Sequence, residues 1–165
     1  MSVYVFGYGA LIHLHKIKEI ERPEKKKICP VMVKGLKRSL NVGGANHLVF
    51  GVKDVKTAVC NGILFKVNAA ELAKLQEREK LYTMKTLAKE RIEFPYKNKK
   101  CVSLTAADQI ICFYPQRTFV LTKKQLLIST LAPASSAYIN NCKAGARAIG
   151  EMFFQDFLDT TTLPV

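Results

Sequence analysis

The sequence of 165 residues has no tryptophan, three histidines and few acidic residues: 13 Asp and Glu stand against 26 Lys and Arg, a formal net charge of +13. No apolar run approaches the roughly 18 to 20 residues that a membrane-spanning helix needs, so we expect no membrane association. The apolar N-terminus lacks a basic stretch and a small-residue cleavage site, which argues against a signal peptide. Apolar residues make up 48% of the chain, a globular composition, and this length predicts a single domain over residues 1–165.

The cysteines are five in number and form no C-x-x-C pair. An odd count without paired spacing is typical of free thiols in a reducing compartment, and it predicts a cytoplasmic protein. These cysteines are Cys29, Cys60, Cys101, Cys112 and Cys142.

The excess positive charge is divided among short clusters. No cluster has the interleaved aromatic residues of a platform for single-stranded nucleic acid, and no nucleic-acid reader motif is present. The sequence therefore favours the solvated loops of a basic protein, without a nucleic-acid partner. The clusters are Lys25-Lys26-Lys27, Lys34/Lys37/Arg38, Lys97/Lys99/Lys100 and Lys123-Lys124.

The pattern of apolar residues predicts more strands than helices. One helix should begin after Asn68, with Glu71 completing a capping box, and run to about Lys80. A last helix should begin at Ser135 or Ser136 and run to about Leu158. Because the strands do not alternate strictly with helices, the sequence favours the α+β class. Strands are expected at Val3–Phe6, Ile28–Val42, Val59–Val67, Thr86–Phe94, Cys101–Leu104 and Gln109–Tyr114, with a loop at Gly43–Asn46.

Glu79 stands out within the first predicted helix. It follows Leu72 by seven residues and Leu75 by four, so it shares their apolar face. Desolvation and the negative end of the helix dipole both disfavour its charged form and should raise its pKa. A carboxyl group with a raised pKa is suited to general acid/base chemistry. A glutamate at a frayed helix end that bends out to water is the alternative.

A second informative segment is Val5-Phe6-Gly7-Tyr8-Gly9-Ala10-Leu11. Two glycines around a tyrosine, directly after a strand, allow a sharp turn that exposes successive N–H groups. Such a turn can hold a carboxylate or a phosphate. The segment is not a dinucleotide-binding fingerprint, because it has no G-x-G-x-x-G spacing.

These two segments together resemble the γ-glutamylcyclotransferase superfamily. The first supplies FGYGALI, and the second supplies REKLY, which ends the strand–helix unit GILFKVNAAELAKLQEREKLY. Both look most like the ChaC branch, which acts on glutathione. A third match is Tyr138, seven residues before Gly145-Ala146, which is similar to the Y-x(6)-G-A segment of the γ-glutamyl dipeptide branch.

The resemblance implies a fold, an activity and a set of site residues. The fold would be a small closed mixed β-barrel with helices packed around it. Glu79 would be the general acid/base for cyclisation of a γ-glutamyl group, from glutathione, a γ-glutamyl dipeptide or an amine, with release of 5-oxoproline. Gly35 and Arg38 would have a structural role. The substrate would contact Val5, Phe6, Gly7, Tyr8, Gly9, Ala10, Leu11 and Tyr138.

The resemblance also implies no metal and no redox cofactor, a small-molecule γ-glutamyl substrate as the partner, and a monomer or homodimer. Three departures from the family pattern matter. Ala10 stands where the family usually has serine, and Lys80-Leu81-Tyr82 lacks the glycines of the ChaC motif and is one residue shorter. Tyr138 matches the γ-glutamyl dipeptide branch better than it matches ChaC. The alternative is therefore a catalytically inactive barrel that binds a γ-glutamyl-like metabolite or an acidic partner.

Overall fold

The computed structural model describes the whole chain except residues 45–46, 97–100, 130–131 and 165. Part of the expected loop at Gly43–Asn46, and the basic cluster of Lys97, Lys99 and Lys100, lie outside the described residues. No helix in the described ranges is long and apolar enough to cross a membrane.

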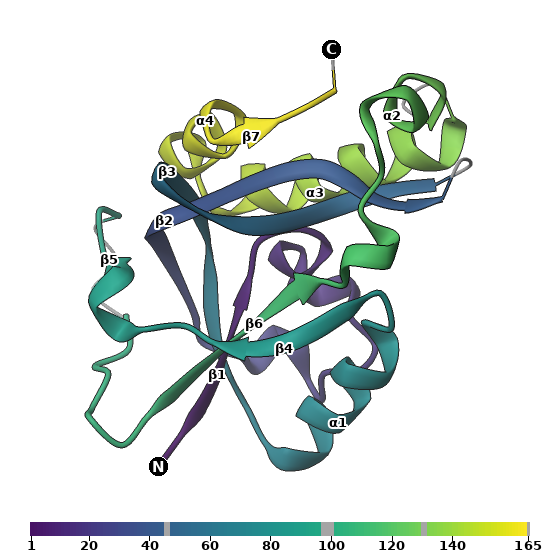
Figure 1. Ribbon diagram of the computed structural model, residues 1–165. Coiled ribbons are helices and arrows are strands. Elements are labelled where there is room, and N and C mark those ends of the chain that lie inside the picture. Colours follow the sequence, from purple (N-terminus) through teal and green to yellow (C-terminus); the bar gives the residue numbers. More distant parts are fainter. Residues whose placement is uncertain (45–46, 97–100, 130–131, 165) are drawn as a thin grey trace.

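The centre of the fold is a curled mixed sheet of seven strands, in the order β4-β6-β1-β3-β2-β5, with β7 beside β2 (Figure 1). Strand β1 is antiparallel to β3 and parallel to β6. The α+β class and the mixed, curled sheet are confirmed, but the sheet forms a half-barrel with β4 and β5 at its edges instead of the closed barrel expected. The strands are β1 (Val3–Gly7), β2 (Ile28–Gly44), β3 (His47–Val67), β4 (Tyr82–Thr86), β5 (Ile92–Glu93), β6 (Gln109–Pro115) and β7 (Thr161–Thr162).

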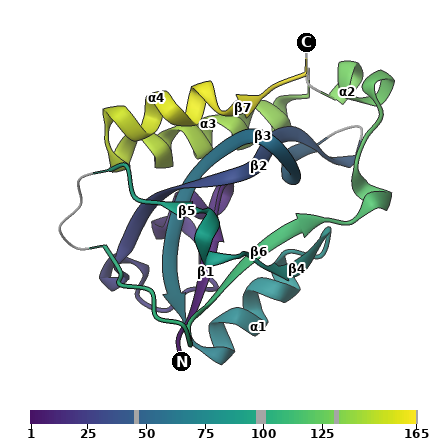
Figure 2. The ribbon, with the colours of Figure 1, turned by 60° about the vertical axis from the view of Figure 1, so that its left-hand side comes forward.

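The long β2–β3 hairpin bends where the register between its strands shifts, between Lys34 and Leu36. Gly35 lies at this bulge with a φ of +73°, a conformation that side chains with a Cβ atom rarely adopt. The distal half of the hairpin then lies against helices α3 (Pro133–Ile149) and α4 (Glu151–Asp159), as Figures 1 and 2 show. The structural role expected for Gly35 agrees with this position.

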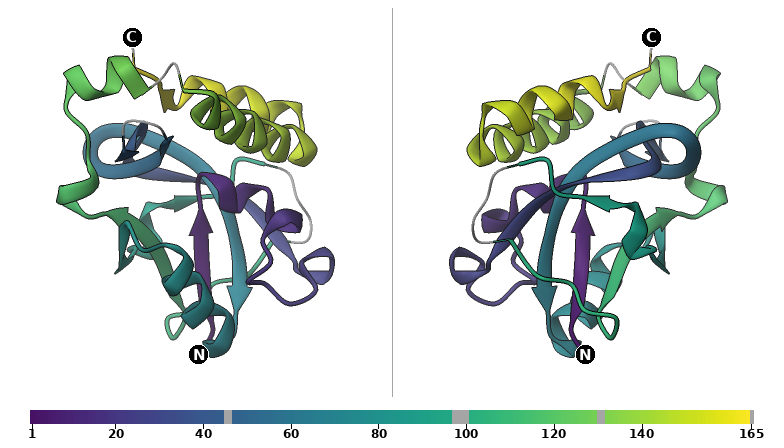
Figure 3. Two further views of the ribbon diagram at one scale, coloured as in Figure 1. Left: turned by 90° about the vertical axis from the view of Figure 1, so that its right-hand side faces the viewer. Right: turned by 90° about the vertical axis from the view of Figure 1, so that its left-hand side faces the viewer.

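The prediction of one long C-terminal helix is wrong. Gly150, with a φ of +151°, separates α3 from α4. Ala132, rather than Ser135 or Ser136, is the N-cap of α3, and the buried Ser135 Oγ instead accepts a hydrogen bond of 2.8 Å from the N–H of Leu48. A short helix α2 (Lys123–Ser129) precedes α3, and the paired helices are seen from two sides in Figure 3.

Helix α1 (Ala69–Arg78) begins as predicted. Asn68 Oδ1 accepts from the N–H of Glu71 at 2.8 Å, and Glu71 Oε2 accepts from the N–H of Asn68 at 3.0 Å. This reciprocal pair satisfies two N–H groups that no helical carbonyl can reach. Two strand predictions fail nearby: residues 101–104 form no strand, and the segment 86–94 is only in part β-structure.

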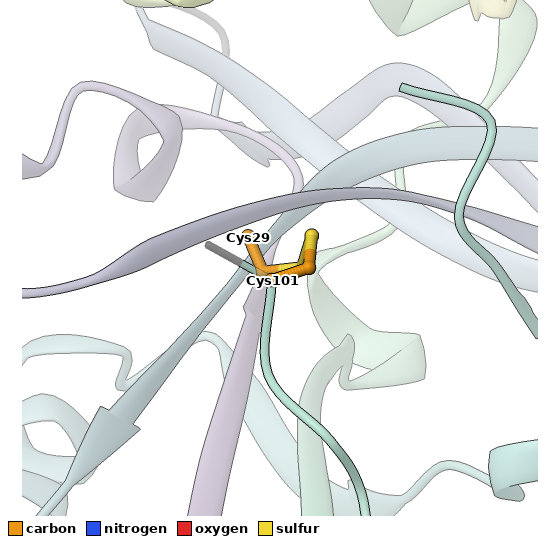
Figure 4. Close-up of a disulfide and its surroundings, with 2 residues drawn as sticks. All are labelled: Cys29 and Cys101. Carbon is orange, nitrogen blue, oxygen red and sulfur yellow. A yellow bond between two sulfur atoms is a disulfide. The ribbon is translucent and has the colours of Figure 1, made fainter. Parts of the chain in front are cut away.

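Two of the cysteines are not free. Cys29 on β2 and Cys101 form a disulfide (Figure 4), so the prediction of five free thiols is wrong for this pair. The two residues are 72 positions apart, and the fold brings the segment after β5 against β2, which sequence spacing does not reveal. Cys60, Cys112 and Cys142 are free and buried. The expectation of a cytoplasmic protein was based on five free thiols, and the disulfide removes that argument.

Arg38 is a fully buried arginine at the junction of the sheet, the first loop and α4. Its guanidinium donates to the carbonyl groups of Tyr8 at 3.0 Å, Asn61 at 2.7 Å and Phe157 at 3.0 Å. The guanidinium carbon lies 4.1 Å from the ring centroid of Phe157. The guanidinium group also donates hydrogen bonds to side-chain oxygens. These side-chain acceptors are Asn61 Oδ1, Thr160 Oγ1 and Thr161 Oγ1.

The Arg38→Met substitution should strongly destabilise the protein. It removes a desolvated donor group and leaves several buried acceptors unpaired, which should lower the free energy of unfolding by about 3 kcal/mol or more. The exposed Lys53 on β3 provides a control, because Lys53→Met removes a charge without breaking a buried network and should change stability by about 0.5 kcal/mol or less. Urea unfolding of both variants measures the difference, and equal stabilities would contradict this role for Arg38.

Candidate active site

A cavity of about 370 Å³ lies where the loop after β1, the end of α1, the free edge of β3 and helix α3 meet. Of the described residues that line it, only Glu79 is acidic, whereas Arg78 and Lys80 add positive charge beside it. The lining residues are Tyr8, Gly9, Ala10, Leu11, His47, Val49, Phe50, Arg78, Glu79, Lys80, Leu81, Tyr82, Phe113, Tyr138 and Asn141.

The structure brings together most of the residues singled out in the sequence. Glu79, Tyr138 and the segment 8–11 all line the cavity, although they come from distant parts of the chain. Val5, Phe6 and Gly7 do not line it. They belong to β1, where they are buried in the core, and they carry the loop rather than face the cavity.

The loop after β1 presents unused hydrogen-bond donors. A 3-10 turn begins at Ala10, and its first backbone bond runs from the N–H of Ile12 to the carbonyl of Gly9 at 3.0 Å. The N–H groups of Gly9, Ala10 and Leu11 donate to no described backbone group. Three successive donors of this kind form a concave site for a carboxylate or a carbonyl oxygen.

Tyr8 holds this loop in place through two groups, its side-chain hydroxyl and its backbone carbonyl. Its hydroxyl donates to the carbonyl of Phe113 on β6 at 2.6 Å, and its own carbonyl accepts from Arg38 at 3.0 Å. Because both contacts are buried, the loop is tied to the sheet on one side and to the arginine network on the other.

Helix α3 packs on the loop at unusually short range. A Cβ atom on Gly145 would lie 2.8 Å from the backbone nitrogen of His13, and a Cβ atom on Gly9 would lie 2.6 Å from the Tyr138 hydroxyl. Both contacts are shorter than real Cβ atoms allow, so only glycine fits without movement. The Tyr138 and Gly145 pair noted in the sequence thus sets how closely α3 approaches the loop.

Tyrosine hydroxyls cover the free edge of β3 above the cavity. The Tyr82 hydroxyl donates to the carbonyl of Phe50 at 2.6 Å, and the N–H of Phe50 donates to the Tyr138 hydroxyl at 3.2 Å. Both rings therefore occupy fixed places on the cavity wall. Sequence reasoning did not assign a role to Tyr82, although it ends the REKLY run.

Glu79 is the C-cap of α1, and its backbone is fixed on both sides. Its N–H donates to the carbonyl of Leu75 at 2.9 Å, and its carbonyl accepts from the N–H of Tyr82 at 3.0 Å. Its side chain is only 17% exposed, so it does not bend out to water as the alternative held. Leu75 on the same face is fully buried, as the periodicity predicts.

Burial raises the pKa of the Glu79 carboxyl group above its usual value. The nearby Arg78 opposes this shift, with Nη1 at 3.9 Å from Glu79 Oε1, and the negative charge of Glu19 reinforces it. Arg78 is itself shared with Glu19, whose Oε2 lies 4.0 Å from Arg78 Nε. The result is a carboxyl group beside the cavity whose protonated form is more favourable than that of an exposed glutamate, which suits general acid/base chemistry.

The close contact between Gly9 and Tyr138 predicts a coupled effect on stability. Gly9→Ala should destabilise the protein by about 1–3 kcal/mol, because the new methyl group overlaps the Tyr138 hydroxyl. Tyr138→Phe removes that oxygen, so the same Gly9→Ala change should cost clearly less in the Tyr138→Phe background. A double-mutant cycle of unfolding free energies measures the coupling, and strictly additive effects would show that the two residues do not meet.

Comparison with known proteins finds solved structures that have the same fold as this chain. No protein-family model matches the chain, and no curated protein matches its sequence. A solved γ-glutamyl cyclotransferase superposes with a TM-score of 0.66 at 13% identity, covering 98% of this chain and 89% of that one.

Two further solved structures agree. A γ-glutamyl cyclotransferase specific to glutathione from yeast has a TM-score of 0.59 at 12% identity, covering 96% of this chain and 95% of that one. An uncharacterized protein from Homo sapiens has a TM-score of 0.60 at 14% identity, covering 98% of this chain and 89% of that one. The chain therefore has the fold of the γ-glutamylcyclotransferase-like superfamily.

Proposed function

We propose that this protein is a γ-glutamylcyclotransferase, with Glu79 as its general acid/base. The observation that carries the proposal is the position of Glu79: a desolvated carboxyl group on a cavity that is also lined by Gly9, Ala10 and Leu11, whose N–H groups donate to no described backbone group. The fold it shares with solved γ-glutamyl cyclotransferases supports the same reading. The substrate is a small molecule with a γ-glutamyl group, and the reaction needs no metal or redox cofactor.

The loop after β1 would bind the γ-glutamyl head group. The N–H groups of Gly9, Ala10 and Leu11 are suited to hold its α-carboxylate or to polarise its γ-carbonyl oxygen. Tyr138, packed on Gly9, would limit the space beside the head group. Because ring closure depends on orientation above all, a substrate held folded in this cavity is already close to the reactive geometry.

Glu79 would carry a proton from the attacking nitrogen of the substrate to its leaving nitrogen. Its carboxylate removes a proton from the α-ammonium group, and the resulting amine attacks the γ-carbonyl carbon to form the new C–N bond of a five-membered lactam. The attacking nitrogen then loses a second proton to solvent, the old bond from that carbon to the leaving nitrogen breaks, and Glu79 returns its proton to the leaving nitrogen. The products are 5-oxoproline and an amine or peptide, and a raised pKa favours both proton transfers.

Ala10 is compatible with this mechanism because the loop acts through its backbone. Alanine keeps the N–H donor and loses a single hydroxyl group relative to the serine usual in the family, which is worth about 0.5–1.5 kcal/mol if it makes one hydrogen bond. A catalytically inactive barrel that binds a γ-glutamyl-like metabolite or an acidic partner is the competing function, and the absence of that hydroxyl is the observation that favours it.

The Glu79→Gln variant tests the proposed role. Release of 5-oxoproline from glutathione and from γ-Glu-Ala should fall by about 100-fold or more, because the amide cannot accept the proton. Glu77→Gln, at an exposed position on the same helix outside the cavity, should retain the activity of the wild type. Full activity in Glu79→Gln would place the base elsewhere. Absence of release by folded wild-type protein from either substrate would favour the inactive barrel.

The pH dependence of the reaction follows from the raised pKa of Glu79. The free enzyme must have the carboxylate form to remove the proton, so kcat/KM should fall as the pH drops through the pKa of this group. This acidic limb should therefore lie above the value of about 4.3 that is usual for glutamate. A profile that stays flat down to pH 4 would contradict the assignment.

A further inference from the structure

A second cavity, of about 920 Å³, lies at the other ends of β1 and α1 and shares no lining residue with the first. It is bounded by the beginning of β1, the residues before β2, the end of β3 and the segment 101–103. Nothing in the proposed reaction uses it. Its described lining residues are Met1, Ser2, Val3, Tyr4, Lys25, Lys26, Lys27, Lys66, Val67, Asn68, Ala69, Cys101, Val102 and Ser103.

The charge of this cavity has one sign. Four of the described lining residues are lysines, and none of the described lining residues is Asp or Glu. Lys66 comes from β3, some forty positions from the Lys25–Lys27 run that the sequence suggested was a solvated loop. The fold thus joins two separate sources of positive charge around one hollow.

Lys26 fixes the Lys25–Lys27 run at the cavity. Its Nζ lies 2.7 Å from Glu71 Oε2 and 3.1 Å from the carbonyl oxygen of Lys66. The Glu71 side chain is only 1% exposed, and its Oε1 also accepts from the N–H of Glu21 at 3.0 Å. Burial alone would raise the pKa of Glu71, but the hydrogen bonds from Lys26, Asn68 and Glu21 outweigh it and the pKa is lowered. This carboxylate is therefore ionised and holds Lys26.

The three remaining lysines have no carboxylate partner in the part of the chain that the structure describes. Among the residues that the structure describes, Lys25, Lys27 and Lys66 take part in no ion pair, whereas Lys34 and Arg91 lie 3.2 Å and 2.9 Å from their carboxylate partners. Positive charges gathered around a hollow without counter-charges repel one another, and a bound anion relieves that repulsion.

The wall formed by residues 101–103 is covalently anchored. Cys101 lines the cavity and is joined by its disulfide to Cys29 on β2 (Figure 4). The cavity consequently has a fixed floor in the ends of β1 and β3 and a tethered side wall. Its lining residues gather at one end of the sheet rather than along a stripe of the surface, which suits a compact ligand better than a nucleic-acid strand.

We propose that this cavity binds a small polyanion with neighbouring phosphate groups, held by Lys25, Lys27 and Lys66. Lys26 positions the run and is neutralised by Glu71, so its neighbours supply the charge for the ligand. The site is independent of the γ-glutamyl reaction, since its residues lie outside the candidate active site.

Isothermal titration calorimetry with inorganic triphosphate in 0.15 M salt tests the proposal. The wild type should show saturable binding, and the triple variant Lys25→Gln/Lys27→Gln/Lys66→Gln should bind about 10-fold more weakly or worse, the loss expected when several charge-assisted contacts are removed. The matched control is Lys16→Gln/Lys53→Gln/Lys56→Gln, which removes the same charge from exposed positions outside the cavity and should change affinity by less than about 3-fold.

Three results would overturn the proposal. No saturable binding by the wild type would exclude the site, and equal weakening in both triple variants would show attraction by the overall charge of +13 rather than by a site. A single-stranded oligonucleotide serves as a further probe: if it binds more tightly than triphosphate and depends on the same lysines, the ligand is a nucleic acid and not a small polyanion. Glu79→Gln should bind triphosphate like the wild type, which separates this test from that of the catalytic role.

Discussion

The guanidinium group of Arg38 connects the parts of the structure that build the candidate active site. It lies on β2, and its hydrogen bonds reach the first loop through Tyr8, β3 through Asn61 and α4 through Phe157. All of its described acceptors are neutral, so carbonyl and hydroxyl dipoles, with the ring of Phe157, replace its hydration. Burial lowers the pKa of Arg38, yet an arginine keeps its charge because its ordinary pKa is so high.

This network determines which groups of the loop are available to a ligand. The carbonyl of Tyr8 is turned inward to Arg38, and the N–H groups of the next three residues remain without described acceptors. The opposite wall is fixed by the tyrosines that cover the β3 edge at Phe50, and Tyr82 follows directly on the turn that begins at Glu79. Loop donors and carboxyl group are thus held against each other by buried contacts.

The sequence predicts the features that depend on residues close together in the chain. The capping box at Asn68 and the apolar face shared by Leu75 and Glu79 are set by local spacing, and the structure contains both. The turn expected at Gly7 to Gly9 lies further along, because Gly7 still belongs to β1 and the 3-10 turn spans Ala10–Ile12. The α+β class follows from the order of such local segments.

The remaining features depend on contacts between distant segments. The Cys29–Cys101 disulfide spans 72 positions. The hydroxyl of Ser135 was expected to cap a helix, but the nearby β3 edge offers the N–H of Leu48 instead. In each case tertiary packing decides between conformations that the local sequence allows equally.

The proposed acid/base role depends most directly on the protonation of Glu79. Nuclear magnetic resonance can follow this protonation at the side-chain carboxyl carbon. A titration of the wild type with ¹³C-labelled glutamate, with Glu79→Gln to assign the signal and Glu77 as an exposed internal reference, reports this pKa in the folded protein. We predict an inflection clearly above the usual value of about 4.3. An inflection at or below that value would show a carboxylate stabilised by Arg78, unsuited to the acid/base role, and would contradict the central claim.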